Sequence, residues 1–198
     1  MLQPYMSLVD LVDNTRTDKN TAHSYLDLYQ ELLVDKKDTA TNVLEIGIGD
    51  GHQGISDGGS IRLWHDFFTK ATVYALDIKH IDGVWDGVKN NNRIRLYTSH
   101  DAYDEALFQR NFGSIKFDLV LDDGPHTLDS ILQCVRLYTQ VLADDGILII
   151  EDVQHWEHIE LLRNEVPAEL RQYVHVYDLR HIKGRYDDIV FTVNKSKK

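Results

Sequence analysis

The chain has 198 residues, 42% of them hydrophobic, which suffices for one α/β domain with a single core. Its net charge of −11 argues against nucleic acid as the main partner, because binding phosphates requires a basic surface. With one cysteine, no apolar run of membrane-spanning length and no secretory pattern at the N-terminus, we expect a cytoplasmic protein without an intrachain disulfide or a membrane span.

Hydrophobic periodicity predicts alternating helices and strands. Helices are expected over 20–35, 60–70, 102–112, 127–142 and 157–164. Strands are expected over 42–47, 71–77, 93–98, 117–123 and 147–150, the last after a turn at Asp145-Gly146. Two late strands, 173–179 and 187–193, are joined by a turn at Lys183-Gly184 and suggest an antiparallel hairpin. We therefore predict a Rossmann-like, doubly wound, mainly parallel seven-stranded sheet in a single domain over 1–198, with a frayed tail at 194–198 and Cys134 in the core.

The run from Asn42 to Gly51 joins a buried strand to a glycine-rich turn. Gly47 and Gly49 allow the backbone to approach a ligand closely. Dinucleotide enzymes use a related turn to hold a pyrophosphate, but the carboxylate of Glu45 would repel a phosphate and attract a cation or an amino group. The alternative is a glycine-rich turn that binds no ligand.

Asp77 ends the second predicted strand and could accept hydrogen bonds from both hydroxyls of a ribose. The alternative is a solvated acid in a turn. In the loop after the third strand, His100 or Asp101 could contact an adenine edge. Together these residues suggest a nucleoside site.

Acidic residues follow four of the first five predicted strands. Because the carboxyl ends of parallel strands meet at one edge of the sheet, these carboxylates should converge, and their repulsion calls for a bound cation or for hydrogen-bond donors. The acids are Glu45, Asp77, the pair Asp122-Asp123 and the pair Glu151-Asp152.

Asp123, Glu151 and Asp152 offer the oxygen ligands that Mg²⁺ prefers, whereas Zn²⁺ is less suited because no cysteine lies nearby. His126 follows Asp123 by three residues and could act as a general base near neutral pH. A cation that polarises a substrate hydroxyl would make it a better nucleophile. The competing view pairs His126 with Asp122 and gives it no chemistry.

Several motifs together resemble the class I S-adenosylmethionine (SAM) methyltransferases, in particular the metal-dependent sugar O-methyltransferases of the macrocin and mycinamicin type. The motifs are Thr17-Asp-Lys19 with His23 and Tyr25, Leu44-Glu-Ile-Gly-Ile-Gly49, Gly58-Gly-Ser-Ile-Arg-Leu-Trp64, Tyr74-Ala-Leu-Asp-Ile78, Phe117-Asp-Leu-Val-Leu-Asp-Asp-Gly-Pro-His126 and Gly146-Ile-Leu-Ile-Ile-Glu-Asp152.

The resemblance implies that Asp123 and Asp152 hold the metal together with Glu151, and that His126 is the base. It also implies SAM as cofactor, bound by Glu45, Gly47, Gly49, Ser60, Asp77, His100, Asp101 and Asp122. Ser60 could hydrogen-bond the SAM carboxylate at a helix N-terminus or act as an ordinary N-cap.

Four other residues carry weaker expectations. Lys19 could contact the same SAM carboxylate or be an ordinary exposed lysine, and Trp64 fits the core better than the site. His155 and Trp156 could line the acceptor pocket or pack on the surface.

The expected function is methyl transfer from SAM to a hydroxyl of a sugar or a similar small polyol, assisted by Mg²⁺ or another divalent cation. The chain could also form a homo-oligomer. An NAD-dependent oxidoreductase and a non-catalytic SAM-binding protein are the alternatives.

Overall fold

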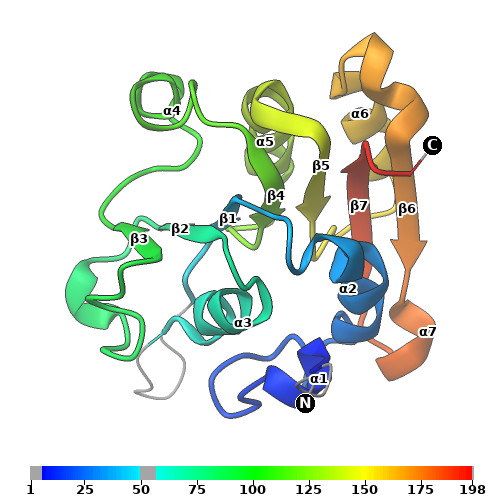
Figure 1. Cartoon of the computed structure of the whole chain (residues 1–198). Helices are drawn as coiled ribbons and strands as arrows, with labels where there is room; N and C mark the ends of the chain where they lie inside the picture. Colours follow the sequence, from blue (N-terminus) through cyan, green and yellow to red (C-terminus); the bar gives the residue numbers. More distant parts are fainter. Residues whose placement is uncertain (1–5, 50–56, 198) are drawn as a thin grey trace.

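The computed structural model describes residues 6–49 and 57–197, so Asp50 and Gly51 of the glycine-rich run lie outside the described residues. Seven strands form one sheet in the order β3-β2-β1-β4-β5-β7-β6 (Figure 1). The strands are β1 (Asn42–Ile46), β2 (Thr72–Leu76), β3 (Ile94–Tyr97), β4 (Phe117–Asp122), β5 (Leu142–Ile150), β6 (Val174–Asp178) and β7 (Ile189–Asn194).

Neighbouring strands are parallel except at β7, which runs antiparallel to both β5 and β6. The predicted mainly parallel sheet with a late antiparallel hairpin strand is therefore confirmed. The chain moves outward from β1 through β2 to β3, then returns to the other side of β1 with β4. In open α/β sheets, ligands bind beyond the carboxyl ends of the strands at such a switch point.

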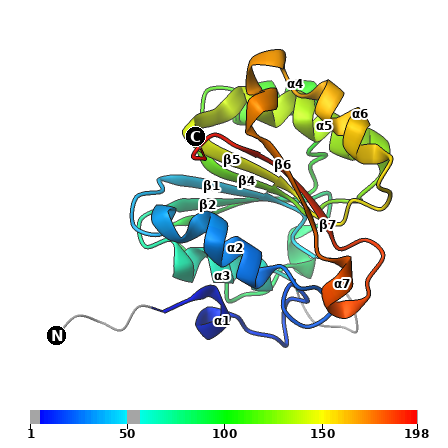
Figure 2. The ribbon, with the colours of Figure 1, turned by 90° about the vertical axis from the view of Figure 1, so that its right-hand side faces the viewer.

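Helices cover both faces of the sheet. Figure 2 shows α1, α2 and α3 below the strands and α4, α5 and α6 above them. The helices are α1 (Leu8–Leu11), α2 (Leu26–Leu33), α3 (Gly59–Phe67), α4 (Glu105–Asn111), α5 (Leu128–Tyr138), α6 (His158–Glu165) and α7 (Arg180–Lys183). None of the helices in the described ranges is long and apolar enough to cross a lipid bilayer.

Alternation along the strands divides the core into two layers. Val43 packs with Trp64 on the α2–α3 face, whereas Leu44 packs with Phe108 and Tyr138 on the α4–α5 face. Cys134 is a buried free thiol in the second layer, as predicted.

The first predicted helix begins later than its pattern suggests. Instead of starting at residue 20, α2 starts at Leu26, because the backbone N–H groups of residues 21–23 all donate to the carbonyl of Asp18. Tyr25 N–H donates to the carbonyl of Lys19 and closes this turn (3.1 Å). The turn brings polar side chains of the leading segment to the sheet edge.

One of two predicted turns has a different structure. Asp145-Gly146 lies within the bounds of β5 but turns as predicted, because residues 143–146 stand opposite a single residue of β4 and regular pairing resumes at Ile147. Between β6 and β7 the short helix α7 stands where a simple turn was expected, and Gly184 ends it in a left-handed conformation.

The C-terminal segment also differs from the expected frayed tail. Asn194 is buried as the last residue of β7, and Lys195 N–H donates to the carbonyl of Gly146 (3.1 Å). Five residues of the tail were expected to fray, whereas these two are held by the sheet.

Candidate active site

Backbone hydrogen bonds extend the sheet ladder just beyond the strands and so hold the acids at one edge. Asp123 N–H donates to the carbonyl of Ile46 (2.8 Å), and Glu151 N–H donates to the carbonyl of Asp122 (3.2 Å). The acids that follow β4 and β5 therefore stand next to each other beside the end of β1, as the strand order predicted.

Asp123, His126 and Asp152 form a compact group. Each offers one potential metal-ligand atom, and these atoms lie within 4.8 Å of one another. His126 Nε2 is 3.6 Å from Asp123 Oδ1 and 3.6 Å from Asp152 Oδ2. His126 therefore faces these two acids, and the alternative that paired it with Asp122 is not what the structure shows.

The backbone at two of these residues is unusual. His126 has φ 55° and Asp152 has φ 53°, in the left-handed region that L-residues seldom occupy. Such conformations cost about 1–3 kcal/mol each and concentrate at functional sites. The fold therefore maintains these two bends in spite of their cost, and both side chains point into one group.

Lys19 lies among the carboxylates and is almost wholly buried. Its Nζ donates to Asp123 Oδ2 (2.7 Å) and to Glu151 Oε1, and it lies 3.5 Å from Glu45 Oε1. Burial opposes the charge on this amine, but the three carboxylates outweigh burial and raise the pKa of Lys19 well above its ordinary value. The expectation of an exposed lysine is therefore wrong, and the SAM contact for it stays untested.

Glu151 is less available than its position in the sequence suggested. Its two oxygens accept hydrogen bonds from Lys19 Nζ and from the hydroxyl of Tyr29, and it belongs to neither group of potential metal ligands found among the described residues. Burial, and then repulsion by Asp123, raise the pKa of Glu151 well above its ordinary value. Metal binding by Glu151 stays a prediction, and each of its oxygens keeps a lone pair for a further ligand.

Two tyrosines of the leading segment reach the site, and sequence reasoning missed this role for both. The Tyr25 hydroxyl donates to Asp152 Oδ1, as the Tyr29 hydroxyl does to Glu151. Burial raises the pKa of Asp152, an effect that the nearby His23 opposes. The spacing of the tyrosines was the available signal, because residues four apart share one face of a helix.

His23, Asp187 and Asp188 were also missed. His23 Nδ1 lies 2.6 Å from Asp188 Oδ1 and 3.2 Å from Asp152 Oδ1. Asp187 and Asp188 precede β7, and both are buried. The signal was weak, because the acids lie at the start of a predicted strand, where ligands are not expected in a parallel sheet. They reach the carboxyl edge because β7 is antiparallel.

Glu45 is wholly buried on the α2–α3 face of β1. Its carboxylate accepts hydrogen bonds from Trp64 Nε1 (2.8 Å) and from Ser60. Burial raises the pKa of Glu45 to about 7, against the opposing effect of Lys19. Trp64 is thus a core residue, as expected. The N-cap of α3 is Gly58, so the reading of Ser60 as an N-cap is wrong.

The loops that were predicted to meet a nucleoside lie together. Asp77 Oδ2 accepts a hydrogen bond from Ile48 N–H (2.7 Å), between the two described glycines of the turn. His100 N–H donates to the carbonyl of Asp77 (3.0 Å), while Asp101 is exposed at the end of the same loop. Ile78, directly after Asp77, is 77% exposed.

Gly47 and Gly49 have φ 91° and 136°, as a close-approach turn requires. A Cβ at Gly47 would lie 1.9 Å from the carbonyl oxygen of Asp123. At this point the glycine therefore serves the packing of one loop of the site against another. Its predicted contact with a cofactor remains untested.

The structure does not bring Asp122 to the other acids. Its side chain points to the opposite face of the sheet, where Oδ1 accepts hydrogen bonds from the Tyr103 hydroxyl (2.8 Å) and from Gly124 N–H (3.1 Å). Burial raises the pKa of Asp122. These contacts make it a support for the turn after β4, and its cofactor role stays a prediction.

His155 and Trp156 are exposed beyond the acidic pair. Trp156 lies under the guanidinium of Arg180 at 5.5 Å, and His155 packs edge-on against His158. These contacts join α6 to α7 at the surface. Whether the two residues also line an acceptor pocket stays a prediction.

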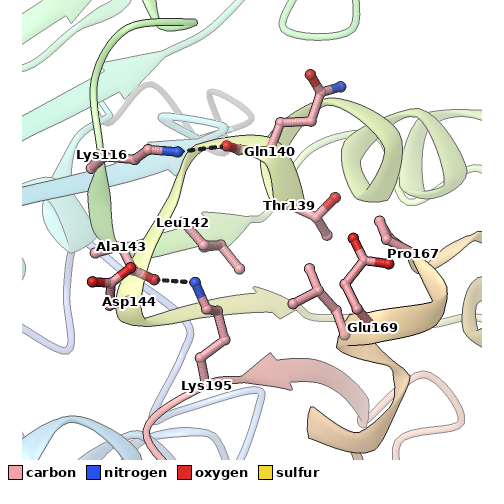
Figure 3. Close-up of a pocket in the computed structure, with 10 residues that line it drawn as sticks. Lys116, Thr139, Gln140, Leu142, Ala143, Asp144, Pro167, Glu169 and Lys195 are labelled. Carbon is pink, nitrogen blue, oxygen red and sulfur yellow. Dashed lines mark hydrogen bonds between the residues drawn. The ribbon is translucent and has the colours of Figure 1, made fainter.

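A hollow of about 540 Å³ lies at the other edge of the sheet, near the amino ends of β4 and β5 (Figure 3). Lys116 and Lys195 line it, but their amines donate to the carbonyls of Gln140 and Ala143 (2.8 and 2.6 Å). The hollow shares no residue with the acidic edge. Chemistry, rather than size, therefore selects the acidic edge as the candidate active site.

Comparisons with known proteins find methyltransferases among the similar proteins. No protein-family profile matches the chain. The chain is 29% identical over 141 residues to 8-demethyl-8-alpha-L-rhamnosyl tetracenomycin-C 2'-O-methyltransferase of Streptomyces olivaceus, which covers 70% of the chain and 35% of that protein. It is 28% identical over 138 residues to mycinamicin VI 2''-O-methyltransferase of Micromonospora griseorubida, covering 66% of the chain and 32% of that protein. The chain thus spans about a third of the length of these curated relatives.

Solved structures show the fold. The MycE methyltransferase of the mycinamycin pathway, in complex with Mg, SAH and mycinamycin VI, superposes with a TM-score of 0.74 over 98% of the chain and 56% of that protein, at 20% identity. An O-methyltransferase from Bacillus cereus in complex with SAH gives 0.57 over 84% of the chain and 79% of that protein, at 15% identity. The chain has the class I methyltransferase fold, and the resemblance predicted from its motifs is confirmed.

Proposed function

We propose that this chain is a SAM-dependent O-methyltransferase that uses a divalent cation such as Mg²⁺ and methylates a hydroxyl of a sugar or a similar small polyol. The observation that carries the proposal is the group of Asp123, His126 and Asp152 at the carboxyl edge of a class I methyltransferase sheet. The likeness to sugar O-methyltransferases supports the choice of acceptor.

The donor set fits a hard divalent cation. Asp123 and Asp152 offer carboxylate oxygens, and their side chains are 27% and 12% exposed. These two acids would hold the ion. When bound, it would polarise the acceptor hydroxyl and lower the pKa of that group.

His126 would take the proton from the hydroxyl. Its Nε2 lies beside both acids, so an acceptor oxygen held there would be within reach of the imidazole as a general base. The left-handed backbone at this residue keeps the ring turned toward the acids.

The donor side fits a nucleoside. Each oxygen of Asp77 accepts one backbone N–H, from Ile48 and Lys79, which leaves lone pairs for two ribose hydroxyls. Ile78 would be covered by an adenine ring, which removes apolar surface from water. Glu45, Gly47, Gly49, Ser60, His100, Asp101 and Asp122 remain proposed cofactor-binding residues.

We also propose that the protein works in the reducing cytoplasm with a small-molecule acceptor and without nucleic acid, as its lone buried thiol and acidic charge suggest. A homo-oligomer stays a prediction that analytical ultracentrifugation tests.

The test replaces the proposed base. His126→Gln should lower the rate of methyl transfer from labelled SAM to sugar glycosides by about 10²–10⁴-fold, with SAM binding by calorimetry unchanged. His181→Gln, on the exposed helix α7, is the matched control and should keep the wild-type rate. Failure of the chain to bind SAM would overturn the proposal. An unchanged rate in His126→Gln would show that His126 is not the general base.

A further inference from the structure

A second group of potential metal ligands lies directly beside the first and shares Asp152 with it. His23, Asp152, Asp187 and Asp188 each present one donor atom, and these atoms lie within 4.8 Å of one another. They come from the turn before α2, the end of β5 and the residues before β7. The shared carboxylate makes the two groups neighbours.

One oxygen in this second group lacks a partner. Asp188 is fully buried, and its Oδ1 lies 2.6 Å from His23 Nδ1. Its other oxygen, Oδ2, is buried and has no hydrogen-bond partner among the described residues. A buried carboxylate oxygen without a donor costs several kcal/mol, so a bound cation would supply a missing interaction.

The spacing of the donors suits a metal ion. His23 Nδ1 is 2.6 Å from Asp188 Oδ1 and 3.2 Å from Asp152 Oδ1. Neighbouring ligands of octahedral Mg²⁺ lie about 3 Å apart, because its bonds are about 2.1 Å long. Asp187 pairs with Arg185 through both oxygens, each of which keeps a lone pair for a further ligand.

Acidic groups outnumber the positive charges at this edge. Six carboxyl groups face the two fixed positive charges of Lys19 and Arg185. The six acids are Glu45, Asp123, Glu151, Asp152, Asp187 and Asp188.

We propose that the chain binds a second divalent cation through His23, Asp152, Asp187 and Asp188, so that the carboxylate of Asp152 bridges two ions. The proposal rests on the proposed function, since the first ion is the one that Asp123 and Asp152 would hold. It adds to that function a two-metal centre.

Manganese tests the proposal on the full chain after removal of metals with a chelator. Equilibrium dialysis should give two Mn²⁺ per chain, and the electron paramagnetic resonance spectrum should show two coupled ions. Asp188→Asn and, as a second variant, His23→Gln should each lower the stoichiometry to one. Asp178→Asn, an acid that pairs with Arg180 outside both groups, should keep two.

The outcomes separate this proposal from the function that it extends. One Mn²⁺ in the wild type, lost in Asp123→Asn and kept in Asp188→Asn, would overturn the second site and leave the first. No bound Mn²⁺ would overturn both. Two bound ions without spectroscopic coupling would overturn the assignment to these residues, and so would two ions kept by both variants when these fold. Coupling between the ions in the wild type supports a bridging carboxylate, whether or not a variant folds.

Discussion

Lys19 supplies a fixed positive charge to an edge where carboxylates would otherwise repel one another. Its ammonium contacts Asp123 and Glu151 and lies close to Glu45, and the lysine itself is almost wholly buried. Each acid therefore has a partner before any ligand arrives. The leading segment of the chain is in this way part of the site.

Removal of this charge should destabilise the fold. Lys19→Met leaves buried carboxylates without a counter-ion, and we expect a loss of about 3–5 kcal/mol in the free energy of unfolding, measured by urea denaturation of the metal-free protein. Lys36→Met is the control. Within residues 6–49 and 57–197, Lys36 forms its one ion pair with Asp145, whose side chain is 64% exposed, so the lost pair should cost under about 1 kcal/mol. Equal losses in the two variants would contradict the role of Lys19.

Glu45 should make stability depend on pH. The pKa of this carboxyl rises from 4.5 to about 7 on folding, so its contribution to stability is complete below about pH 4.5 and is lost as the pH rises through about 7. Between about pH 5 and pH 8 the free energy of unfolding should fall on the order of 3 kcal/mol more in the wild type than in Glu45→Gln. Denaturant titration of the metal-free proteins measures this difference.

Glu165→Gln serves as the control, because Glu165 contributes to the pH dependence of stability with the opposite sign to Glu45. Arg136 lowers the pKa of Glu165 through a hydrogen-bonded ion pair, so the stability from this acid is lost as the pH falls. If Glu45→Gln keeps the whole pH dependence of the wild type, the buried carboxyl is not its source.

Single residues explain what the sequence could and could not reveal of the site. Asp123, His126 and Asp152 were predictable, because acids after parallel strands meet at one edge and the histidine follows three residues later. The burial of Lys19 among the carboxylates was not, since its side chain reaches the edge only through the turn that Asp18 organises. That turn has no periodic pattern.

At the scale of elements, the close packing of the loop after β1 against the loop after β4 depends on Gly47. Its φ of 91° disfavours any other residue, and a Cβ would also meet the backbone carbonyl of Asp123. Gly184 isolates the first effect, because its φ is 74° and nothing lies within 4 Å of a Cβ placed there.

Substitutions at the two glycines should therefore differ. Gly184→Ala should cost about 1–2 kcal/mol from backbone strain alone. Gly47→Ala should cost more, by calorimetric unfolding, and should also weaken Mn²⁺ binding because Asp123 must move. Equal destabilisation by the two variants, or unchanged metal binding in Gly47→Ala, would show that the close contact with Asp123 does not matter.

One predicted boundary was wrong because a local turn replaces the start of a helix. The helical pattern over 20–35 is real from Leu26 onward, but the preceding residues form a turn around the carbonyl of Asp18 that holds polar side chains against the sheet edge. Asp145-Gly146 turns as its composition predicts, because regular pairing of β5 with β4 resumes only at Ile147.

At the scale of the whole molecule, a bound cation should stabilise the fold by mass action. Mg²⁺ at about 100 times its dissociation constant should add about 2.7 kcal/mol to the free energy of unfolding, seen as a rise in melting temperature. Asp152→Asn should abolish the rise, whereas Asp178→Asn should keep it. A magnesium-dependent rise in Asp152→Asn equal to that of the wild type would exclude Asp152 as a ligand.

The overall architecture was predictable because strands and helices alternate with clear periodicity, and right-handed crossovers then leave few arrangements. The antiparallel direction of β7 was also expected from the late hairpin. Its consequence for Asp187 and Asp188 was not, because only the three-dimensional order of strands places the start of β7 beside the end of β5.

The left-handed bends at His126 and Asp152 set a limit for anyone who wishes to engineer a hardier version of this protein. Glycine would relax the backbone at both bends, yet it would delete the two side chains on which the proposed reaction depends. A screen for thermal stability alone would select such changes, whereas a screen that also requires turnover would discard them. Gains in robustness that preserve turnover should therefore come from substitutions elsewhere in the chain.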